Sequence, residues 1–291
     1  MYHRILPRIQ AAREGVLPGM YVAPETFARH LAWLETYFRV LPLHEIVAGI
    51  AGDRPLPPGA CAITFDDGWR DNAEYALPEL ERRGLPATIF VVTQRVGTSG
   101  AFWPDEIGRR MATLGAHEQQ GLAQRLGASA SPEPIYALVH HLKPLSEAQR
   151  GEALDALREA TDAPSSGAPE LLDWDELTRL ASAGIDIEAH GATHAILSAL
   201  PAVEAERELR TARETMRAHG HGRHRLLAYP NGDHDAEVRR IARELGYRGA
   251  VTTENGLASA RSDAMSIPRV ALHDDVSRTR AEFLSRVPGA A

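Results

Sequence analysis

The sequence predicts an α/β protein whose parallel strands can close into a barrel. Short runs of apolar and β-branched residues alternate with longer helical patterns along most of the chain, and this alternation is typical of right-handed βαβ units. The chain has 291 residues, of which 44% are hydrophobic. That is enough apolar material for the core of one barrel-sized domain or of two smaller ones.

The predicted strands are short and largely apolar, which indicates that they are buried. Four of them are Cys61–Phe65, Ala87–Val92, Ile185–Ala189 and Leu226–Tyr229. Arg248–Thr253 and Ile267–Leu272 look like two more, and Tyr2–Leu6 is a further candidate at the start of the chain. Six or seven units of this kind could close into a barrel.

Helices are predicted between these strands, and most of them stop near a glycine, a common helix end. They are Glu25–Tyr37, Asp71–Arg83, Trp174–Ser182, Ala199–His219 and Asp235–Leu245. This order places one helix after nearly every strand, as a parallel sheet requires.

The stretch from about Trp103 to Pro169 interrupts the alternation. It contains helical patterns at Asp105–Leu114, Glu118–Leu126 and Ser146–Ala160 but no convincing strand. We interpret it as a helical insertion after the second strand, within a single domain that spans residues 1–291. Ala163–Pro169 is then the loop that leads back to the barrel.

Composition excludes several classes of protein. The net charge is −7, and no basic block recurs on one predicted face, so we expect no nucleic-acid partner. Cys61 is the only cysteine, which excludes an internal disulfide and a four-cysteine zinc site. No stretch reaches the ~18 apolar residues of a membrane span. The N-terminus has no hydrophobic signal region, so we expect a cytoplasmic chain, or an exported one if its N-terminus is trimmed.

The segment Thr64-Phe65-Asp66-Asp67-Gly68 ends the first of these strands. Two adjacent carboxylates at a strand end are costly unless a cation or a proton compensates them. Because side chains alternate along a strand, one carboxylate can bind a metal while its neighbour takes a proton. The alternative is an ordinary Asp-Asp-Gly turn.

His190 and His194 follow the strand Ile185–Ala189 and lie four residues apart. Two such imidazoles share one face of a helical turn and can chelate one metal ion. The alternative is two histidines with structural partners. Both motifs stand at the carboxyl ends of predicted strands, where parallel barrels place their sites. One carboxylate and two imidazoles leave a position for water, as in catalytic rather than structural metal sites, and the other carboxylate would act on that water.

Two further strand ends carry candidate residues. Tyr229-Pro230-Asn231-Gly232-Asp233 could form a tight loop whose backbone N–H groups face an oxyanion, or it could be a plain turn. His273, after the last strand, is a candidate general acid, although a loop histidine can also be structural or solvated.

Other polar and aromatic residues have competing interpretations. Trp103 and Trp174 could stack on a sugar, although Trp174 also fits a helix start packed on the barrel. The tract from His219 to His224 could bind a metal, but it lies away from the predicted catalytic end, which favours a solvated loop.

Taken together, these motifs resemble the polysaccharide deacetylase family, the family 4 carbohydrate esterases. The resemblance covers most of the chain except the insertion, and it implies a distorted (β/α)7 barrel. It also implies that Asp66 is the catalytic base and that Asp67, His190 and His194 bind a divalent metal, zinc before cobalt, nickel or manganese. The opening Tyr2-His3-Arg4 and the Tyr-Pro-Asn-Gly segment look like the branch that acts on exopolysaccharide or cell-surface glycans.

The chain departs from the family pattern at two places. Many members carry Arg at the position of Ala228, where it orients the catalytic base, and we suggest that Arg269 replaces it. The family's Asp-plus-Trp fourth motif is not visible near Tyr247–Glu254.

The resemblance predicts a hydrolase that deacetylates N-acetylated sugars in a poly- or oligosaccharide. Asp66 would take a proton from metal-bound water, a backbone N–H near Asn231 would help the metal hold the oxyanion, and His273 would protonate the leaving amine. Two alternatives stay open: a related barrel amidase that acts on a small non-sugar amide, and a catalytically silent glycan-binding protein. The sequence does not indicate an oligomeric state.

Overall fold

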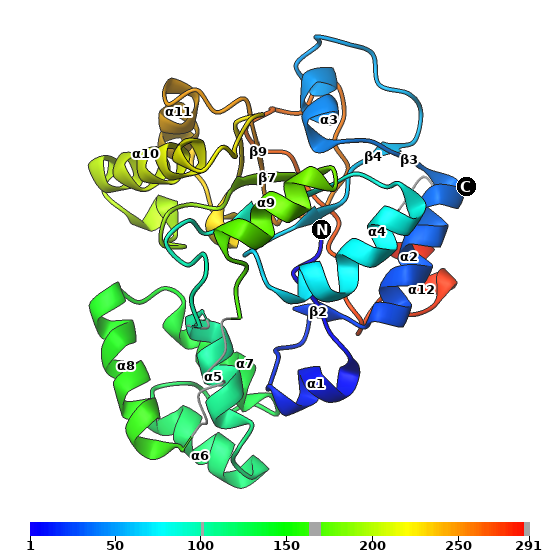
Figure 1. Cartoon of the computed structure of the whole chain (residues 1–291). Helices are drawn as coiled ribbons and strands as arrows, with labels where there is room; N and C mark the ends of the chain where they lie inside the picture. The colour runs from blue at the N-terminus through cyan, green and yellow to red at the C-terminus, as the bar shows by residue number, and fades with distance from the viewer. Residues whose placement is uncertain (100–101, 163–169, 288–291) are drawn as a thin grey trace.

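A computed structural model describes residues 1–99, 102–162 and 170–287 of the chain. A curled parallel sheet lies at the centre, with helices around it (Figure 1). In the described residues this sheet has five strands, paired in chain order. They are β5 (Thr64–Phe65), β6 (Ala87–Val91), β7 (Ile185–Ala189), β8 (Leu226–Ala228) and β9 (Gly249–Val251).

The two chain ends close this sheet into a distorted barrel. At one edge Tyr2 forms a parallel bridge with Phe65, and Asp66 N–H donates to the Tyr2 carbonyl at 3.0 Å. At the other edge Ile267 bridges Val251. The extended chain then returns to the N-terminus, where Leu272 N–H donates to the Met1 carbonyl at 3.1 Å. Counted over the described parts of the chain, the ring has seven extended segments, as the sequence predicts.

The predicted strand at Cys61–Phe65 is divided between two sheets. Its first part belongs to β4 (Ala60–Cys61), which pairs with β3 (Arg39–Val40) outside the ring. Only its second part, β5, pairs with β6. The run is apolar because β4 is half-buried and β5 is buried. Apolarity alone does not show where the chain changes its pairing partner. After Tyr2, the chain forms β1 (Arg4–Ile5), which pairs in parallel with β2 (Tyr21–Val22).

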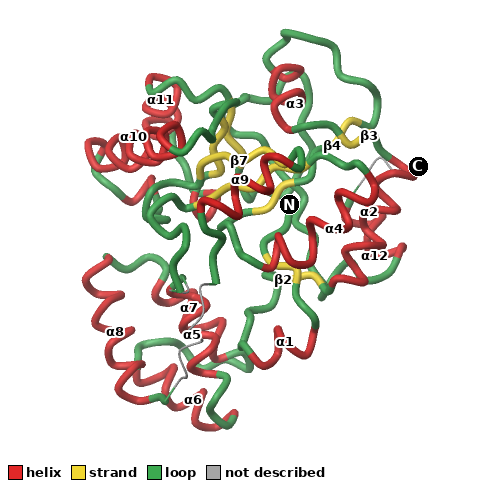
Figure 2. Tube along the Cα trace, viewed as in Figure 1, coloured by secondary structure: helices red, strands yellow, loops and turns green. Residues whose placement is uncertain are grey.

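Helices cover the outside of the barrel (Figure 2). Their apolar faces pack on the strands. They are α2 (Pro24–Tyr37), α4 (Leu77–Arg83), α9 (Trp174–Ser182), α10 (Ala202–Ala218), α11 (Ala236–Glu244) and α12 (Arg280–Arg286). Two small helices, α1 (Arg8–Arg13) and α3 (Leu43–Ile50), lie outside this layer, and short 3-10 turns occupy Leu197–Ala199 and Pro230–Gly232. The helix predicted over Asp71–Arg83 begins as a π-helical turn, Asn72–Ala76, and becomes α-helical only at Leu77.

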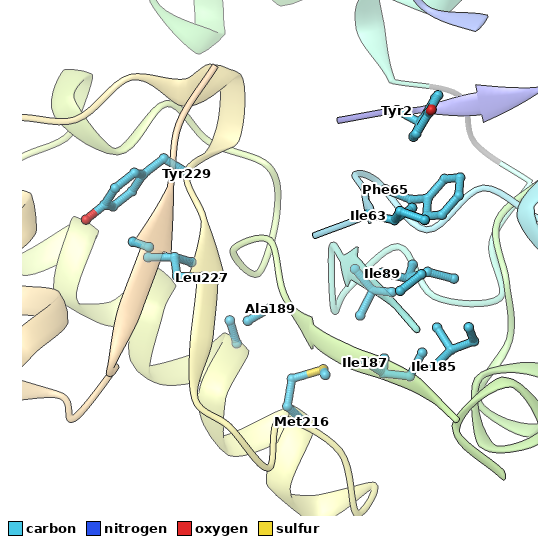
Figure 3. Close-up of a cluster of buried hydrophobic side chains, with 14 of the residues drawn as sticks. Tyr2, Ile63, Phe65, Ile89, Ile185, Ile187, Ala189, Met216, Leu227 and Tyr229 are labelled. Carbon is cyan, nitrogen blue, oxygen red and sulfur yellow. The ribbon is translucent and has the colours of Figure 1, made fainter. Parts of the chain in front are cut away.

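Strand side chains that face the surrounding helices form the main core. Tyr2, Phe65, Ile89, Ile187 and Leu227 belong to one buried cluster (Figure 3). Phe65 is fully buried, and its ring lies 5.5 Å from that of Tyr2 and 5.8 Å from that of Phe27. The contact between Tyr2 and Phe65 therefore joins the first segment of the ring to the sheet.

The helical insertion is present after β6, as predicted. It contains α5 (Trp103–Met111), α6 (Ala116–Arg125), α7 (Pro134–Leu142) and α8 (Glu147–Ala160). These helices lie to one side of the barrel (Figure 1) and share an apolar cluster of their own, which includes Ile107, Leu122, Leu138 and Leu157. Of these helices, α7 is not among those predicted from the sequence. The predicted loop Ala163–Pro169 lies outside the described residues. In the part of the chain that the structure describes, no helix has the length and apolarity needed to cross a membrane.

Replacement of Phe65 by alanine tests the closure of the ring. We expect Phe65→Ala to lower the free energy of unfolding by about 3–5 kcal/mol, the usual cost of emptying a buried aromatic position. Ile9→Ala is the control, since Ile9 is 86% exposed and should change stability by no more than about 0.5 kcal/mol. Urea unfolding of both variants gives the comparison, and equal stabilities would contradict the packing described here.

Candidate metal centre

The end of β5 presents two buried carboxylates in different directions. Asp66 continues the strand, while Asp67 and Gly68 have φ values of 75° and 81°, so the chain turns sharply between them. A Cβ at residue 68 would lie 2.9 Å from Val91 Cγ1, and only glycine fits there without a shift. Because of this turn, Asp66 and Asp67 face different partners.

Asp67 lies between the two predicted histidine ligands. Its Oδ1 is 3.4 Å from His190 Nε2 and 3.5 Å from His194 Nε2. Ligand atoms bound at the usual zinc distances in a tetrahedral site are about 3.4 Å apart. The carboxylate oxygen therefore already has the spacing from each imidazole nitrogen that one zinc ion requires, and the three donor atoms all lie within 4.8 Å of one another.

The histidines are oriented for this role by their own contacts. His190 Nδ1 donates to the Ala228 carbonyl at 2.8 Å, which leaves Nε2, the atom that faces Asp67, to bind a metal ion in place of a proton. Such a hydrogen bond is the usual way to fix the tautomer of a metal-binding histidine. His194 adopts a φ of 74°, and its side chain is 22% exposed, so the cluster is open to solvent on this side.

The charges of the cluster stabilise one another. Burial by itself would raise the pKa of Asp67, but the imidazoles of His190 and His194 hold it well below its usual range. For His190, burial favours the neutral form, and the Asp67 and Asp66 carboxylates outweigh it and raise the pKa. A divalent cation would supply positive charge beside the buried Asp67 carboxylate.

Asp66 forms a bidentate ion pair with Arg269. The two guanidinium NH groups donate to Asp66 Oδ1 at 2.8 Å and to Oδ2 at 2.6 Å. Arg269 is held in turn by the Thr252 carbonyl, at 2.7 Å from its Nε. Although burial opposes ionisation, Arg269 lowers the pKa of Asp66, so this carboxyl stays ionised. The structure thus brings Arg269 to the carboxylate that the sequence analysis assigned to it.

The loop after β8 lies beside the metal cluster, but its tyrosine does not. A Cβ on Gly191 would come within 3.3 Å of Pro230 Cγ, so Pro230 packs against the segment between the two histidines. Asn231 has a φ of 65°, and its side chain donates to Asp233 Oδ2 at 2.8 Å. Tyr229 is fully buried, and its hydroxyl donates to the Met265 carbonyl at 2.9 Å. Tyr229 was predicted as part of an oxyanion- and substrate-binding loop, but its side chain belongs to the core (Figure 3).

The two tryptophans considered for sugar stacking have structural partners instead. Trp103 packs against the apolar cluster of the insertion, with the Arg150 guanidinium 4.9 Å from its ring centroid. The Trp174 ring is stacked on His219 at a centroid distance of 3.8 Å. These contacts favour packing roles, including the helix-start role considered for Trp174.

Two further histidines, His273 and His3, have different surroundings. His273 Nδ1 forms a 3.1 Å hydrogen bond with Asp275 Oδ2. His3, at the N-terminal segment of the ring, lies close enough to Asp67 and Asp66 for their charges to oppose the lowering of its pKa by burial. In the sequence, His3 is notable only for its family likeness.

Further neighbours of Asp67 come from outside the two motifs. Trp69 Nε1 donates to Asp67 Oδ2 at 3.0 Å, and the Phe102 ring lies 4.8 Å from that of His194. Asp105, at the start of α5, is buried, and burial together with the charge of Asp67 raises its pKa to about 7. Trp69 stands two residues after Asp67, so the motif indicates that it lies near the site but not which atom its indole contacts.

Among the described residues, a second group with three potential metal ligands contains His44, Asp186 and His224. His44 Nδ1 and His224 Nε2 face different oxygens of Asp186, at 3.1 and 3.2 Å. The two rings are stacked, with centroids 3.7 Å and planes 5° apart, so their lone pairs lie in separate, nearly parallel planes and do not meet at one point. The distances are those of hydrogen bonds, and the geometry favours a hydrogen-bonded cluster over a second metal site.

Comparisons with known proteins agree with this geometry. A family model described as polysaccharide deacetylase matches residues 53–124 and 135–250, more than half of the chain. The protein YxkH of Bacillus subtilis (strain 168), whose name assigns it to the polysaccharide deacetylases, is 22% identical over 260 residues, which cover 89% of this chain and 68% of YxkH.

Solved structures show the same fold. The deacetylase PplD of Streptococcus pyogenes, in complex with acetate, aligns with a TM-score of 0.65 at 17% identity, over 99% of this chain and 96% of PplD. IcaB of Ammonifex degensii aligns with a TM-score of 0.62 at 18% identity, over 98% of this chain and 94% of IcaB.

Zinc content tests the ligand set. We expect the wild-type chain to hold about one zinc ion after gel filtration. His194→Ala should lose the ion, because only two of the three ligand atoms remain. His44→Ala is the matched control and should keep the wild-type content. Elemental analysis gives the zinc content of the three proteins. Full zinc occupancy in His194→Ala would exclude His194 as a ligand.

Proposed function

This chain belongs to the polysaccharide deacetylase family, and on that premise we propose that it is a metal-dependent hydrolase that removes acetyl groups from N-acetylated sugars of a poly- or oligosaccharide. The observation that carries the proposal is the buried Asp66–Arg269 pair beside the Asp67, His190 and His194 cluster. Binding alone would need no ionised base at this position. The likeness of the opening segment and of Tyr-Pro-Asn-Gly supports exopolysaccharide or cell-surface glycan as substrate.

Asp67, His190 and His194 fit a divalent ion, with zinc first and cobalt, nickel or manganese as alternatives. When bound, such an ion supplies a Lewis acid that acidifies water and polarises a carbonyl oxygen. With Asp67, His190 and His194 as its protein ligands, a bound ion would keep positions for water and for the acetamide oxygen.

Asp66 is the proposed general base. Its carboxylate is kept ionised and fixed in direction by both NH groups of Arg269. It accepts a proton from the attacking water and so generates the hydroxide that adds to the acetyl carbon. The pairing with Arg269 also offsets the cost of keeping this charge buried.

The oxyanion and the leaving amine need two further groups. The loop at Asn231 lies beside the histidine segment through the contact between Pro230 and Gly191, which supports its backbone N–H as an oxyanion donor. An imidazole would protonate the leaving amine. His273 is the donor that the sequence predicts.

Asp66→Asn tests the base directly. We expect kcat to fall by about 10²–10⁴-fold, the usual contribution of general acid–base catalysis, while the zinc content stays at the wild-type value. Acetate release and elemental analysis are measured on the same preparation. A variant with near-normal kcat would show that Asp66 is not the base.

Arg269→Ala tests the orientation of that base. Removal of both guanidinium hydrogen bonds should lower kcat by about 10–100-fold, the range found for partners that orient site residues, without loss of zinc. Free guanidinium, at concentrations below those that unfold the chain, should restore part of the activity. An unchanged kcat would mean that Arg269 only neutralises charge.

The choice of substrate separates the rival functions. With zinc or cobalt added, acetylated chito-oligosaccharides should release acetate. Acetate from small non-sugar amides alone would identify a related amidase. Oligosaccharide binding without acetate release would identify a catalytically silent glycan-binding protein.

A further inference from the structure

The two oxygens of Asp67 have different partners. Oδ1 faces both imidazoles, at 3.4 and 3.5 Å. Oδ2 accepts a hydrogen bond from the indole Nε1–H of Trp69 at 3.0 Å. One oxygen is thus directed at the metal position and the other is already engaged by the protein.

Trp69 is held firmly in this place. It is fully buried, and its backbone forms an antiparallel bridge with Leu171. The Arg4 guanidinium lies 4.2 Å from its ring centroid, within the range of a cation–π interaction. Phe102 meets the ring edge-on at 5.7 Å. With both neighbours in contact, the indole cannot turn its N–H away from Asp67 without a change in packing.

Arg4 is itself fixed by two acidic residues. Its Nε donates to Asp71 Oδ2 at 2.8 Å, and its NH2 group lies 3.0 Å from Glu14 Oε2. The guanidinium therefore remains charged and in position over the indole. A cation over the ring withdraws π-electron density, which makes the indole N–H a stronger donor to Asp67.

We propose that Trp69 is a positioning residue that holds Asp67 as a single-oxygen ligand. A carboxylate can bind a metal through one oxygen or through two, and the second mode would occupy a further coordination position. Engagement of Oδ2 by the indole favours the first mode and keeps the remaining positions for water and substrate oxygen. This inference rests on the proposed metal site.

The insertion takes part in the same arrangement. Phe102 immediately precedes α5 and contacts the Trp69 ring on one side and the His194 ring, at 4.8 Å, on the other. The start of the insertion therefore packs on a metal ligand and on the residue that positions another. This contact gives the insertion a structural role at the site.

Trp69→Phe removes the N–H while it keeps an aromatic ring. We expect its zinc affinity, measured by competition with a chromophoric chelator, to fall by about 10–100-fold, as for other groups that orient metal ligands. In the cobalt-loaded protein, the visible absorption should weaken, because a carboxylate that binds through both oxygens raises the coordination number. Trp33→Phe is the matched control, since Trp33 packs against the barrel core and His30, and it should keep the wild-type affinity and spectrum.

Zinc affinity and a cobalt spectrum equal to those of the wild type in Trp69→Phe would overturn the inference and leave the proposed function intact. A wild-type chain that binds no zinc would instead overturn the metal site. If Trp69→Phe does not fold, benzothienylalanine at position 69 replaces the N–H by sulfur at nearly constant shape. The same loss of affinity is expected there, and unchanged affinity would again overturn the inference.

Discussion

The burial of two adjacent carboxylates is the constraint on which the rest of the site depends. Asp66 and Asp67 are 1% and 6% exposed, and each buried charge costs several kcal/mol unless it is paired. The chain compensates the charges of the two carboxylates separately. Arg269 pairs with Asp66, and two imidazoles face Asp67, with room for a cation. This separation gives the two carboxylates different chemistry, although they are neighbours in sequence and lie at the end of the same strand.

The closed ring of strands makes the separation possible. Arg269 is 203 residues away from Asp66 along the chain, and it arrives in the extended segment that joins β9 to the N-terminus. His190 and His194 follow β7, and the carbonyl that fixes His190 belongs to β8. Because parallel strands direct their carboxyl ends to the same side, these groups meet without any local sequence relation. The loss of an arginine at Ala228 is compatible with this arrangement, since the backbone of Ala228 still orients His190.

The parts predicted from sequence are those with a local signal. The strand pattern predicts the barrel and its insertion, and the paired aspartates and histidines predict the metal cluster. The contribution of Trp69 was missed because its spacing does not show which atom the indole faces. Phe102 and Arg4 belong to separate segments that meet only in the folded chain. Tyr229, Trp103 and Trp174 were considered for substrate binding on residue type alone. Their packing against the core, Arg150 and His219 depends on which face of each element is buried.

Titration of zinc into the metal-free chain, with acetate release from an acetylated chito-oligosaccharide as the readout, tests the central claim most directly. The account predicts no activity in the metal-free chain and a rate that rises with zinc until about one equivalent is bound. A metal-free chain that releases acetate at the full rate would contradict it.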